Sequence, residues 1–510
     1  MKMWLDTSFT TSSGKDSSNG ECTSDCTPDC APDEHHNSAK IMLTKTSNLQ
    51  DDIHSFSSGV FRQERPLHIQ ECAQGKWLVC HPTGQGHVTV LDSQSYNLLA
   101  LFLTPHTLDE ALTLQTTVPS QSTTFMIALL YKIGLLQRTD VPSSPLQKEE
   151  QLRSISAWLH ITNACNLRCH YCYLEKTNEH MPEDISRHAI DAIFHSAVRR
   201  KIQDVYLKYA GGEASLYMNR MIALHDYATA RAWEHGITLH ATLLSNGVVL
   251  SQRTIDQLKT RNIGIAISLD GIGTFHNNQR PFLHGQNSFH YVDRTIKRLL
   301  SNDLLPHINV TVSRRNLDGL PELLTYILEY ELPFKLSYYR DNDCVRDGKA
   351  LQFDEQMMIA AMSKAFCIIE RHLPKRSLLG SLIDHADLRA PHQHPCGVGH
   401  NYLVVNQNGG IAKCHMDIKR TVTTVHAEDP LQQIRDDQLG IQGLAVEQKE
   451  GCRACEWRYW CGGGCPLLTY RMKGRYDVKS PNCGIYKALF PEALRLEALR
   501  LLKYEVPISI

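Results

Sequence analysis

An alternation of strands and helices between residues 157 and 373 constrains this 510-residue chain more than any other feature. Short segments rich in aliphatic and β-branched residues are separated by longer segments with apolar residues at helical spacing. The strand candidates are residues 157–162, 204–210, 238–245, 263–270, 307–313 and 333–339. Six such units predict an α/β fold with a parallel sheet and helices outside it.

Short polar motifs follow four of these predicted strands. They occupy residues 163–169, 211–213, 245–247 and 270–271. In parallel sheets of this kind, ligands bind at the carboxyl ends of the strands. We therefore expect the functional site at this edge of the sheet.

Charge and hydropathy exclude several classes of partner. The net charge of −1 creates no overall field that would attract nucleic acid or an anionic membrane. No segment reaches the roughly 18–20 consecutive apolar residues of a membrane span. The first twenty residues lack the apolar core of a secretory signal. We expect a cytoplasmic chain with neither a nucleic-acid nor a membrane partner.

Three cysteines lie close together directly after the first predicted strand: Cys165, Cys169 and Cys172. In a reducing cytosol, clustered cysteines indicate metal ligands or catalytic groups rather than disulfides. A short loop can hold three irons of a 4Fe-4S cube and leave the fourth open to a small molecule. Structural zinc, the alternative, normally has four ligands, often in two Cys-x2-Cys pairs. The spacing favours an iron–sulfur cluster.

This loop resembles that of the radical SAM enzymes, whose signature Cys-x3-Cys-x-aromatic-Cys is completed here by Tyr171. The resemblance implies a partial (β/α)6 radical SAM barrel over residues 155–375, with S-adenosylmethionine bound at the open iron. It also implies an external one-electron reductant such as flavodoxin or ferredoxin. In this family the reduced cluster cleaves S-adenosylmethionine, and the resulting 5′-deoxyadenosyl radical abstracts hydrogen from the substrate.

The motif after the second predicted strand resembles the Gly-Gly-Glu-Pro motif of the same family, with Ala214 in place of proline. The resemblance implies that Glu213 accepts a hydrogen bond from the amino group of S-adenosylmethionine. Gly211 and Gly212 are expected to let the backbone approach the ligand closely.

Residues 245–247 and 268–289 are similar to the branch of the family that modifies peptides. By that resemblance, Ser268 and Arg280 are expected to hold the carboxylate or the ribose of the cosubstrate, and a guanidinium suits a carboxylate. Ordinary turn or surface roles are the alternative for both residues.

A second group of seven cysteines lies between residues 391 and 486, in the order and spacing of the SPASM domain. The resemblance implies two auxiliary 4Fe-4S clusters in addition to the one that binds S-adenosylmethionine. One would be held completely by Cys452, Cys455, Cys461 and Cys483. The other would be held in part by Cys396, Cys414 and Cys465.

The second auxiliary site lacks a fourth cysteine, since Ala390 stands where sulfatase-maturing relatives have one. The missing ligand is absent, comes from Cys367 or a histidine, or is supplied by the substrate. The remaining scattered cysteines, Cys72, Cys80 and Cys344, are expected to be small buried residues, which is the alternative for Cys367.

The same relatives carry an aspartate base directly after the second motif cysteine. Here Cys414 is followed by His415, and Asp417 comes two residues later. Formylglycine chemistry is therefore disfavoured. His415 or Asp417 could accept a proton, and a hydrogen bond from His415 to a cluster sulfur is the alternative.

The N-terminal part of the chain contains two further regions. Residues 1–60 are rich in Ser, Thr, Asp and His and predict a disordered tail. The tail includes Cys22, Cys26 and Cys30, which lack the surroundings of a metal site. Residues 66–138 predict two strands followed by three helices, and residues 139–154 predict a linker.

The strand–helix order of residues 66–138 resembles the PqqD-like peptide-recognition domain, a small winged helix-turn-helix that binds a leader peptide as an added strand. A packing or dimerisation domain is the alternative. Residues 487–510 predict a C-terminal amphipathic helix. Together these features predict a maturase that forms a thioether or carbon–carbon crosslink in a ribosomally made precursor peptide. A maturase of a sulfatase-like protein or a quinone cofactor, and a non-catalytic iron–sulfur electron carrier, are the alternatives.

Overall fold

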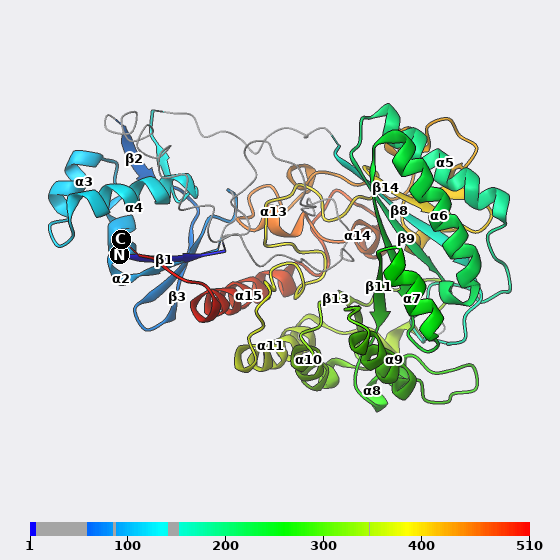
Figure 1. Cartoon of the computed structure of the whole chain (residues 1–510). Coiled ribbons are helices and arrows are strands. Elements are labelled where there is room, and N and C mark those ends of the chain that lie inside the picture. The colour runs from blue at the N-terminus through cyan, green and yellow to red at the C-terminus, as the bar shows by residue number, and fades with distance from the viewer. Residues whose placement is uncertain (7–58, 85–87, 141–151, 346, 510) are drawn as a thin grey trace.

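The computed structural model describes residues 1–6, 59–84, 88–140, 152–345 and 347–509 (Figure 1). Within residues 154–338 the predicted α/β architecture is confirmed, because all six predicted segments are strands. They are β8 (Ser154–Thr162), β9 (Asp204–Gly211), β10 (Thr238–Ser245), β11 (Ile263–Ser268), β12 (His307–Val312) and β13 (Phe334–Tyr338). Every neighbouring pair in the order β13-β12-β11-β10-β9-β8 is parallel.

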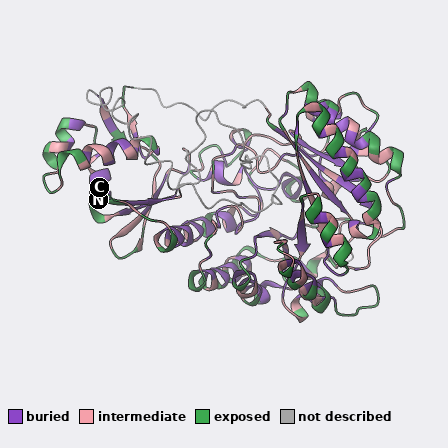
Figure 2. Cartoon of the chain, in the orientation of Figure 1, coloured by how far each residue is buried: buried purple, intermediate pink, exposed green. Residues whose placement is uncertain are grey.

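Helices cover the outer face of this sheet, as Figure 1 shows for the green part of the chain. They are α5 (Glu183–Arg199), α6 (Met218–His235), α7 (Gln252–Thr260), α8 (Thr274–Gln279), α9 (Phe289–Ser301), α10 (Leu320–Glu329) and α11 (Glu355–Arg371). Alternate strand residues, such as Ile155, Ala157 and Leu159 on β8, are buried in the main hydrophobic core (Figure 2). Because every second side chain of a strand points to the same face of the sheet, these buried residues form the surface on which the helices pack.

The sheet continues past β8 into the C-terminal part of the chain. β14 (Tyr402–Val405) pairs in parallel with β8, and β15 (Gly410–Ala412) and β16 (Thr421–Thr424) follow in antiparallel order. The sequence predicted a separate extension over residues 391–486, but the first strand of that segment belongs to the barrel sheet. This arrangement gives the edge of β8 the hydrogen-bond partners that a buried backbone requires.

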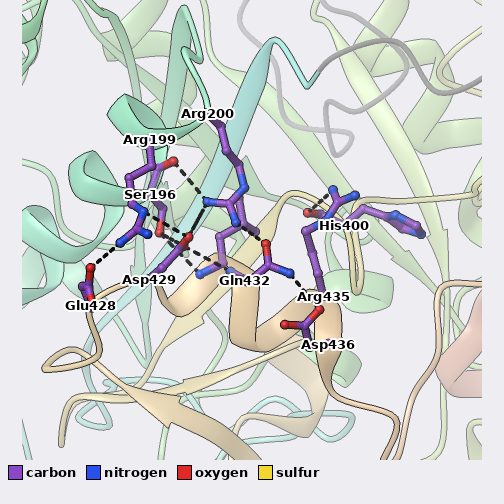
Figure 3. Close-up of polar contacts among 10 residues, drawn as sticks. Ser196, Arg199, Arg200, His400, Glu428, Asp429, Gln432, Arg435 and Asp436 are labelled. Carbon is purple, nitrogen blue, oxygen red and sulfur yellow. Dashed lines mark hydrogen bonds and ion pairs between the residues drawn. The ribbon is translucent and has the colours of Figure 1, made fainter.

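A polar network fastens the same segment to the first barrel helix (Figure 3). Asp429 is the N-cap of α12 (Pro430–Asp436) and accepts hydrogen bonds from Ser196 Oγ (2.9 Å) and Arg200 Nη1 (2.8 and 2.9 Å). Arg200 Nη2 also donates to Gln432 Oε1 at 2.7 Å. Charged groups from the end of α5 therefore hold the start of α12.

The strands and helices predicted for residues 66–138 are present. β4 (Lys76–Cys80) and β5 (Thr89–Asp92) pair in antiparallel order, and β3 (His68–Ala73) pairs with β4. The helices are α2 (Ser93–Leu101), α3 (Leu108–Leu114) and α4 (Ser120–Lys132). A small second sheet has the order β6-β2-β7 and consists of β6 (His106–Thr107), β2 (Val60–Gln63) and β7 (Leu136–Arg138).

The N-terminal residues depart from the prediction. Instead of a tail, β1 (Lys2–Leu5) pairs with β5 on one side and with β17 (Ile508–Ser509) on the other. Met3 and Leu5 are buried in the core of the N-terminal domain, whereas Trp4 is buried in the main core. The prediction is therefore wrong for residues 2–5, while Cys22, Cys26 and Cys30 lie outside the described residues.

The predicted C-terminal helix is present as α15 (Cys483–Tyr504) and begins at the last cysteine of the second group. It packs against β3 and β5 of the five-stranded sheet β17-β1-β5-β4-β3. Arg500, which is 2% exposed, donates to Asp6 Oδ2 (2.8 Å) and Glu497 Oε1 (2.9 Å). Most of the predicted linker lies outside the described residues, and its last residue, Ser154, already belongs to β8. None of the described helices has the length and hydropathy required to cross a bilayer.

Candidate functional site

The three-cysteine loop follows β8 at the carboxyl end of the sheet. Its backbone is held by the segment after α8, because Arg168 N donates to Pro281 O (2.7 Å) and His170 N donates to Gln279 O (3.0 Å). Burial raises the pKa of Cys169 to about 12. The charges of Cys172 and Cys165 also raise it, so the three thiols lie near one another.

Lys176, which no motif identified, lies beside this loop. Its Nζ donates to Cys172 Sγ at 3.0 Å. Burial would lower the pKa of this ammonium, but the thiols of Cys172 and Cys165 raise it overall. A buried cation at this position favours the thiolate form of the three cysteines, which is the form that binds iron.

Among the described residues, no three His, Cys, Asp or Glu side chains converge on one point so as to hold a single metal ion. A cubane cluster makes a different demand, since each of its ligands binds a different iron atom. Its thiolates are spread around the cube. Such a cluster therefore requires cysteine side chains that lie near one another, and the cysteines assigned to clusters form three such groups.

The Gly-Gly-Glu motif lies directly against the backbone that leads into the cysteine loop. Gly212 N donates to Thr162 O at 2.6 Å, and Glu213 N donates to Ala164 O at 2.8 Å. A Cβ on Gly211 would lie 2.4 Å from Thr162 O, and one on Gly212 would lie 2.3 Å from Ala164 O. Gly211 also has a φ of +150°. In this structure the glycines let the two loops approach each other closely.

Glu213 is 2% exposed and connects the loops after β9 and β10. Its carboxylate accepts hydrogen bonds from Ser245 Oγ (2.9 Å) and Asn246 N (2.7 Å). Asn246 Nδ2 in turn donates to Asn166 Oδ1 at 2.7 Å, beside Cys165. The motifs after three successive strands therefore form one hydrogen-bonded unit, as their positions in the sequence predicted.

Tyr171 and Arg280 belong to a buried polar cluster with Asp270, the first residue of the motif at residues 270–271. Tyr171 OH donates to Asp270 Oδ2 at 2.6 Å, and Arg280 Nη1 donates to Tyr171 OH. Asp270 is 1% exposed and also accepts from Thr311 N at 2.8 Å. Ser268 lies at the end of β11, beside Asn309 of β12, and is not part of this cluster.

Four thiols of the C-terminal part form a second group. Burial, together with the neighbouring thiols, raises the pKa of Cys452 to about 11 and that of Cys461 to about 12. Those neighbours are Cys455 and Cys483 for Cys452, and Cys452, Cys455 and Cys483 for Cys461. These are the four cysteines that the sequence assigned to one complete cluster.

The third group contains Cys396, Cys414 and Cys465. Burial raises the pKa of Cys396 to about 11 and that of Cys414 to about 12, and the thiol of Cys465 raises both. Cys465 itself behaves differently. Burial would raise its pKa, but the charge of Arg340 and then the charge and hydrogen bond of His385 lower it to about 6. Cys367 is exposed on α11, unlike these buried thiols.

Lys449 lies between the two C-terminal groups and is 1% exposed. Its Nζ donates to Gly462 O at 3.1 Å. Burial lowers the pKa of this ammonium, while the thiols of both groups, Cys452 first and then Cys396, raise it. The two C-terminal groups are therefore adjacent.

His415 lies in an aromatic environment rather than in an open cleft. Its ring stacks on Trp158 with centroids 4.6 Å apart and meets Tyr173 edge-on at 5.6 Å. Nδ1 lies 3.2 Å from Tyr402 OH. Asp417 is half-buried, and burial raises the pKa of its carboxyl.

Tyr173 connects the first and third thiol groups. Burial raises the pKa of its hydroxyl, and the thiols of Cys172 and Cys414 raise it further. Cys172, Tyr173, Cys414 and Cys465 also share one hydrophobic cluster. The three-cysteine loop and the incomplete C-terminal group therefore lie on the same hydrophobic cluster, with the partly buried ring of Tyr173 near both.

Comparison with known proteins agrees with this geometry. The Radical SAM superfamily matches residues 159–325. An uncharacterized protein of Archaeoglobus fulgidus is 24% identical over 358 residues, 66% of this chain and 81% of that protein. The antilisterial bacteriocin subtilosin biosynthesis protein AlbA of Bacillus subtilis is 23% identical over 321 residues, 61% of this chain and 66% of AlbA.

A solved structure has the same fold. Native anSMEcpe with bound AdoMet and Cp18Cys peptide aligns with a TM-score of 0.54 at 15% identity, covering 69% of this chain and 98% of anSMEcpe. The likeness at this identity concerns the fold alone. It confirms the α/β barrel that the strand–helix alternation predicted.

Proposed function

We propose that this radical SAM enzyme, whose family domain spans residues 159–325, modifies a ribosomally made precursor peptide. The observation that carries the proposal is that Tyr173 lies near two separate sets of cysteines at the carboxyl ends of the barrel strands. One group has three cysteines beside the Gly-Gly-Glu unit. The other belongs to a cysteine-rich segment joined to the same sheet.

The donor set suits a cubane cluster in the first group. Cys165, Cys169 and Cys172 would hold it, and the buried ammonium of Lys176 would balance part of the thiolate charge. When bound there, a 4Fe-4S cluster supplies the electron that cleaves S-adenosylmethionine. Glu213 keeps a carboxylate beside the loop. Its Oε1 already accepts from Ser245 Oγ and Ser215 N, whereas Oε2, which accepts from Asn246 N, can accept a second hydrogen bond of the kind an ammonium donates.

The buried cluster around Asp270 would define the other wall of the cosubstrate site. Arg280 is fixed by Tyr171 and Asp270, and its charge also faces Cys169 and Cys165. We propose that this fixed guanidinium positions the carboxylate or ribose of S-adenosylmethionine through residues of the cysteine loop. Ser268, at the end of the neighbouring strand, would contribute from β11.

The two C-terminal thiol groups would hold the auxiliary 4Fe-4S clusters. Cys452, Cys455, Cys461 and Cys483 would hold one, and Cys396, Cys414 and Cys465 would hold three positions of the other. Their role would be to position the peptide or to accept the electron that remains after hydrogen abstraction. An external one-electron reductant, such as flavodoxin or ferredoxin, would supply the first electron.

The N-terminal domain would bind the precursor by strand addition. In the five-stranded sheet, β5 has β4 on one side and β1 on the other, so its edges are already paired. The edge strands of this sheet are β3 and β17. We propose that the leader segment of the precursor pairs with β3, which is the longer of the two.

We propose a thioether or carbon–carbon crosslink as the product, and the names of the relatives support a peptide substrate. AlbA takes part in bacteriocin biosynthesis, and anSMEcpe has been solved with a bound peptide. A sulfatase-like protein substrate is the second candidate, because anSMEcpe shares the fold. The position after Cys414 favours the first, since His415 is packed between aromatic rings where sulfatase-maturing relatives have an aspartate.

The proposal is tested with the reconstituted full chain, dithionite and S-adenosylmethionine under anaerobic conditions. Formation of 5′-deoxyadenosine is expected, and its absence from protein with a full iron content would refute radical chemistry. Co-expression with a small precursor peptide, sought among the genes that neighbour the gene of this chain, is expected to change the mass of that peptide by loss of two hydrogens. An unmodified precursor, with 5′-deoxyadenosine still formed, would favour the protein-substrate alternative.

A further inference from the structure

His385 is one of five described residues other than glycine that have a positive φ. Four of them directly follow the C-cap of an α-helix, where the left-handed conformation is common: Lys201, Asn262, Asp303 and Glu331. His385, with a φ of +53°, instead occupies the third position of a turn in which Ala386 N donates to Ile383 O at 3.1 Å. The turn fixes the direction in which the imidazole leaves the backbone.

The contacts of His385 connect it to two of the three cysteines in the incomplete group. Its Nδ1 lies 3.3 Å from the carbonyl oxygen of Pro395, the residue directly before Cys396. The imidazole also lies close enough to the Cys465 thiol for its charge to lower the pKa of that thiol. His385 therefore lies between Cys396 and Cys465, the two ends of the group.

The segment that carries His385 is rigidly held at this place. The preceding residue, Asp384, is 2% exposed and accepts two hydrogen bonds from Arg340 Nη2 (2.6 and 2.8 Å). Arg340 Nε donates to Cys465 Sγ at 3.2 Å. Asp387 N donates to Trp460 O at 3.0 Å, and Trp460 directly precedes Cys461. The ring of His385 is thus placed by contacts on both sides of it.

The ring orientation matches that of a histidine ligand. A metal-bound histidine commonly donates its other ring N–H to a backbone carbonyl, which fixes the tautomer. With Nδ1 on the Pro395 carbonyl, Nε2 is the nitrogen that remains on the side of the cysteines. The group needs one further ligand, because it contains three thiols and the sequence has Ala390 where relatives have a fourth cysteine.

We infer that Nε2 of His385 is the fourth protein ligand of the cluster held by Cys396, Cys414 and Cys465. The inference rests on the proposed function, since it requires a 4Fe-4S cluster at these thiols. It assigns the site three thiolates and one imidazole. Imidazole is a neutral ligand, so this cluster carries one negative charge less than its four-cysteine neighbour and is easier to reduce. The cluster then has no open iron for a substrate thiolate.

The test uses the full chain with Cys165, Cys169 and Cys172 replaced by Ala, so that only the C-terminal clusters remain. The protein is produced with ¹⁵N-labelled histidine, reconstituted with iron and sulfide, reduced, and measured by pulsed EPR. A strong ¹⁵N coupling of a directly bound imidazole is expected. In the same background, His385→Cys is expected to keep the iron content and lose the coupling, because a thiolate replaces the imidazole.

His394→Gln is the matched control. His394 lies in the same segment, two residues before Cys396, and its nearest charged neighbours are His400 and Lys449 rather than the thiols. The coupling is expected to persist in this variant. A full complement of two clusters without a histidine coupling, or a coupling that survives His385→Cys, would overturn the assignment of His385 and leave the two proposed auxiliary clusters in place. Iron and sulfide for only one cluster would overturn both the assignment and the proposed second auxiliary cluster.

Discussion

Arg340 and Cys465 are joined by a hydrogen bond of 3.2 Å from Nε to Sγ, although 125 residues separate them in the chain. Arg340 follows the last barrel strand, and Cys465 precedes α14 (Pro466–Lys473). The same guanidinium binds Asp384 with two hydrogen bonds. One buried cation therefore connects the barrel, the segment before the C-terminal cysteines and a predicted cluster ligand.

We expect Arg340→Met to lower the free energy of unfolding by roughly 3–5 kcal/mol, because Asp384 would keep a buried charge without its partner. Urea unfolding of the reconstituted chain measures this change. The double variant Arg340→Met with Asp384→Asn is expected to recover part of the loss. Equal stability of the single and double variants would contradict the role assigned to the ion pair.

The three thiol groups predict separable effects of cysteine removal. Replacing Cys165, Cys169 and Cys172 with Ala is expected to abolish 5′-deoxyadenosine formation while the iron of the C-terminal groups is retained. Replacing Cys452 and Cys455 is expected to spare much of the uncoupled cleavage and to abolish peptide modification. Iron analysis and chromatography of the nucleoside measure both effects, and the reverse pattern would overturn the assignment of the groups.

Glu213→Gln is expected to destabilise the loops around the cosubstrate site. The side-chain amide of glutamine would direct a donor at either Ser245 Oγ or Asn246 N, both of which now donate to the carboxylate. The cost is about 1–3 kcal/mol for a buried group left without a partner. Urea unfolding measures it, and the rate of 5′-deoxyadenosine formation is expected to fall in parallel. Ser245→Ala, which removes a single donor, is the control and should cost less than Glu213→Gln.

His160 on β8 predicts a pH dependence of stability. Burial lowers its pKa to about 4, compared with an ordinary value of 6.5, and Nε2 lies 2.7 Å from Asn163 Oδ1. Because the folded pKa is depressed, the stabilisation is complete above pH 6.5 and is lost as the pH falls towards 4. The contribution is roughly 3 kcal/mol. The difference in unfolding free energy between the wild type and His160→Gln should shrink over this range, and a constant difference would contradict the prediction.

His415→Phe distinguishes packing from proton transfer. Phenylalanine keeps the stacking on Trp158 and Tyr173 but removes the ring nitrogen that faces Tyr402. Because the ring is enclosed by aromatic side chains, we expect peptide modification to fall less than tenfold. Mass spectrometry of the precursor measures the yield. A loss of more than a hundredfold with normal 5′-deoxyadenosine formation would instead identify His415 as the proton acceptor.

The sequence predicted the barrel well because buried parallel strands carry continuous apolar runs that are separated by helical segments. It also predicted which motifs meet, since parallel strands end at the same edge. Lys176 and Arg340 were not predicted. Each is a single charged residue without a motif, and its partner is chosen by tertiary folding, as in the contact of Arg340 with Cys465 across 125 residues.

Two further differences have physical causes. β1 has four residues, which is too short for a periodicity to be detected, although its side chains complete two cores. From the change in composition near residue 391, the sequence predicts a separate segment that would include β14. The hydrogen-bonding requirement of the edge of β8 instead draws it into the barrel sheet.

The pairing of β1 with β17 has a consequence for synthesis on the ribosome. Lys2–Leu5 are translated long before one of their neighbouring strands, Ile508–Ser509. The helix that leads to β17 begins at Cys483, which belongs to the four-cysteine group. The N-terminal sheet and that group therefore wait for the same later segment during translation. The proposed cluster of this group can be completed only after Cys483 has left the ribosome.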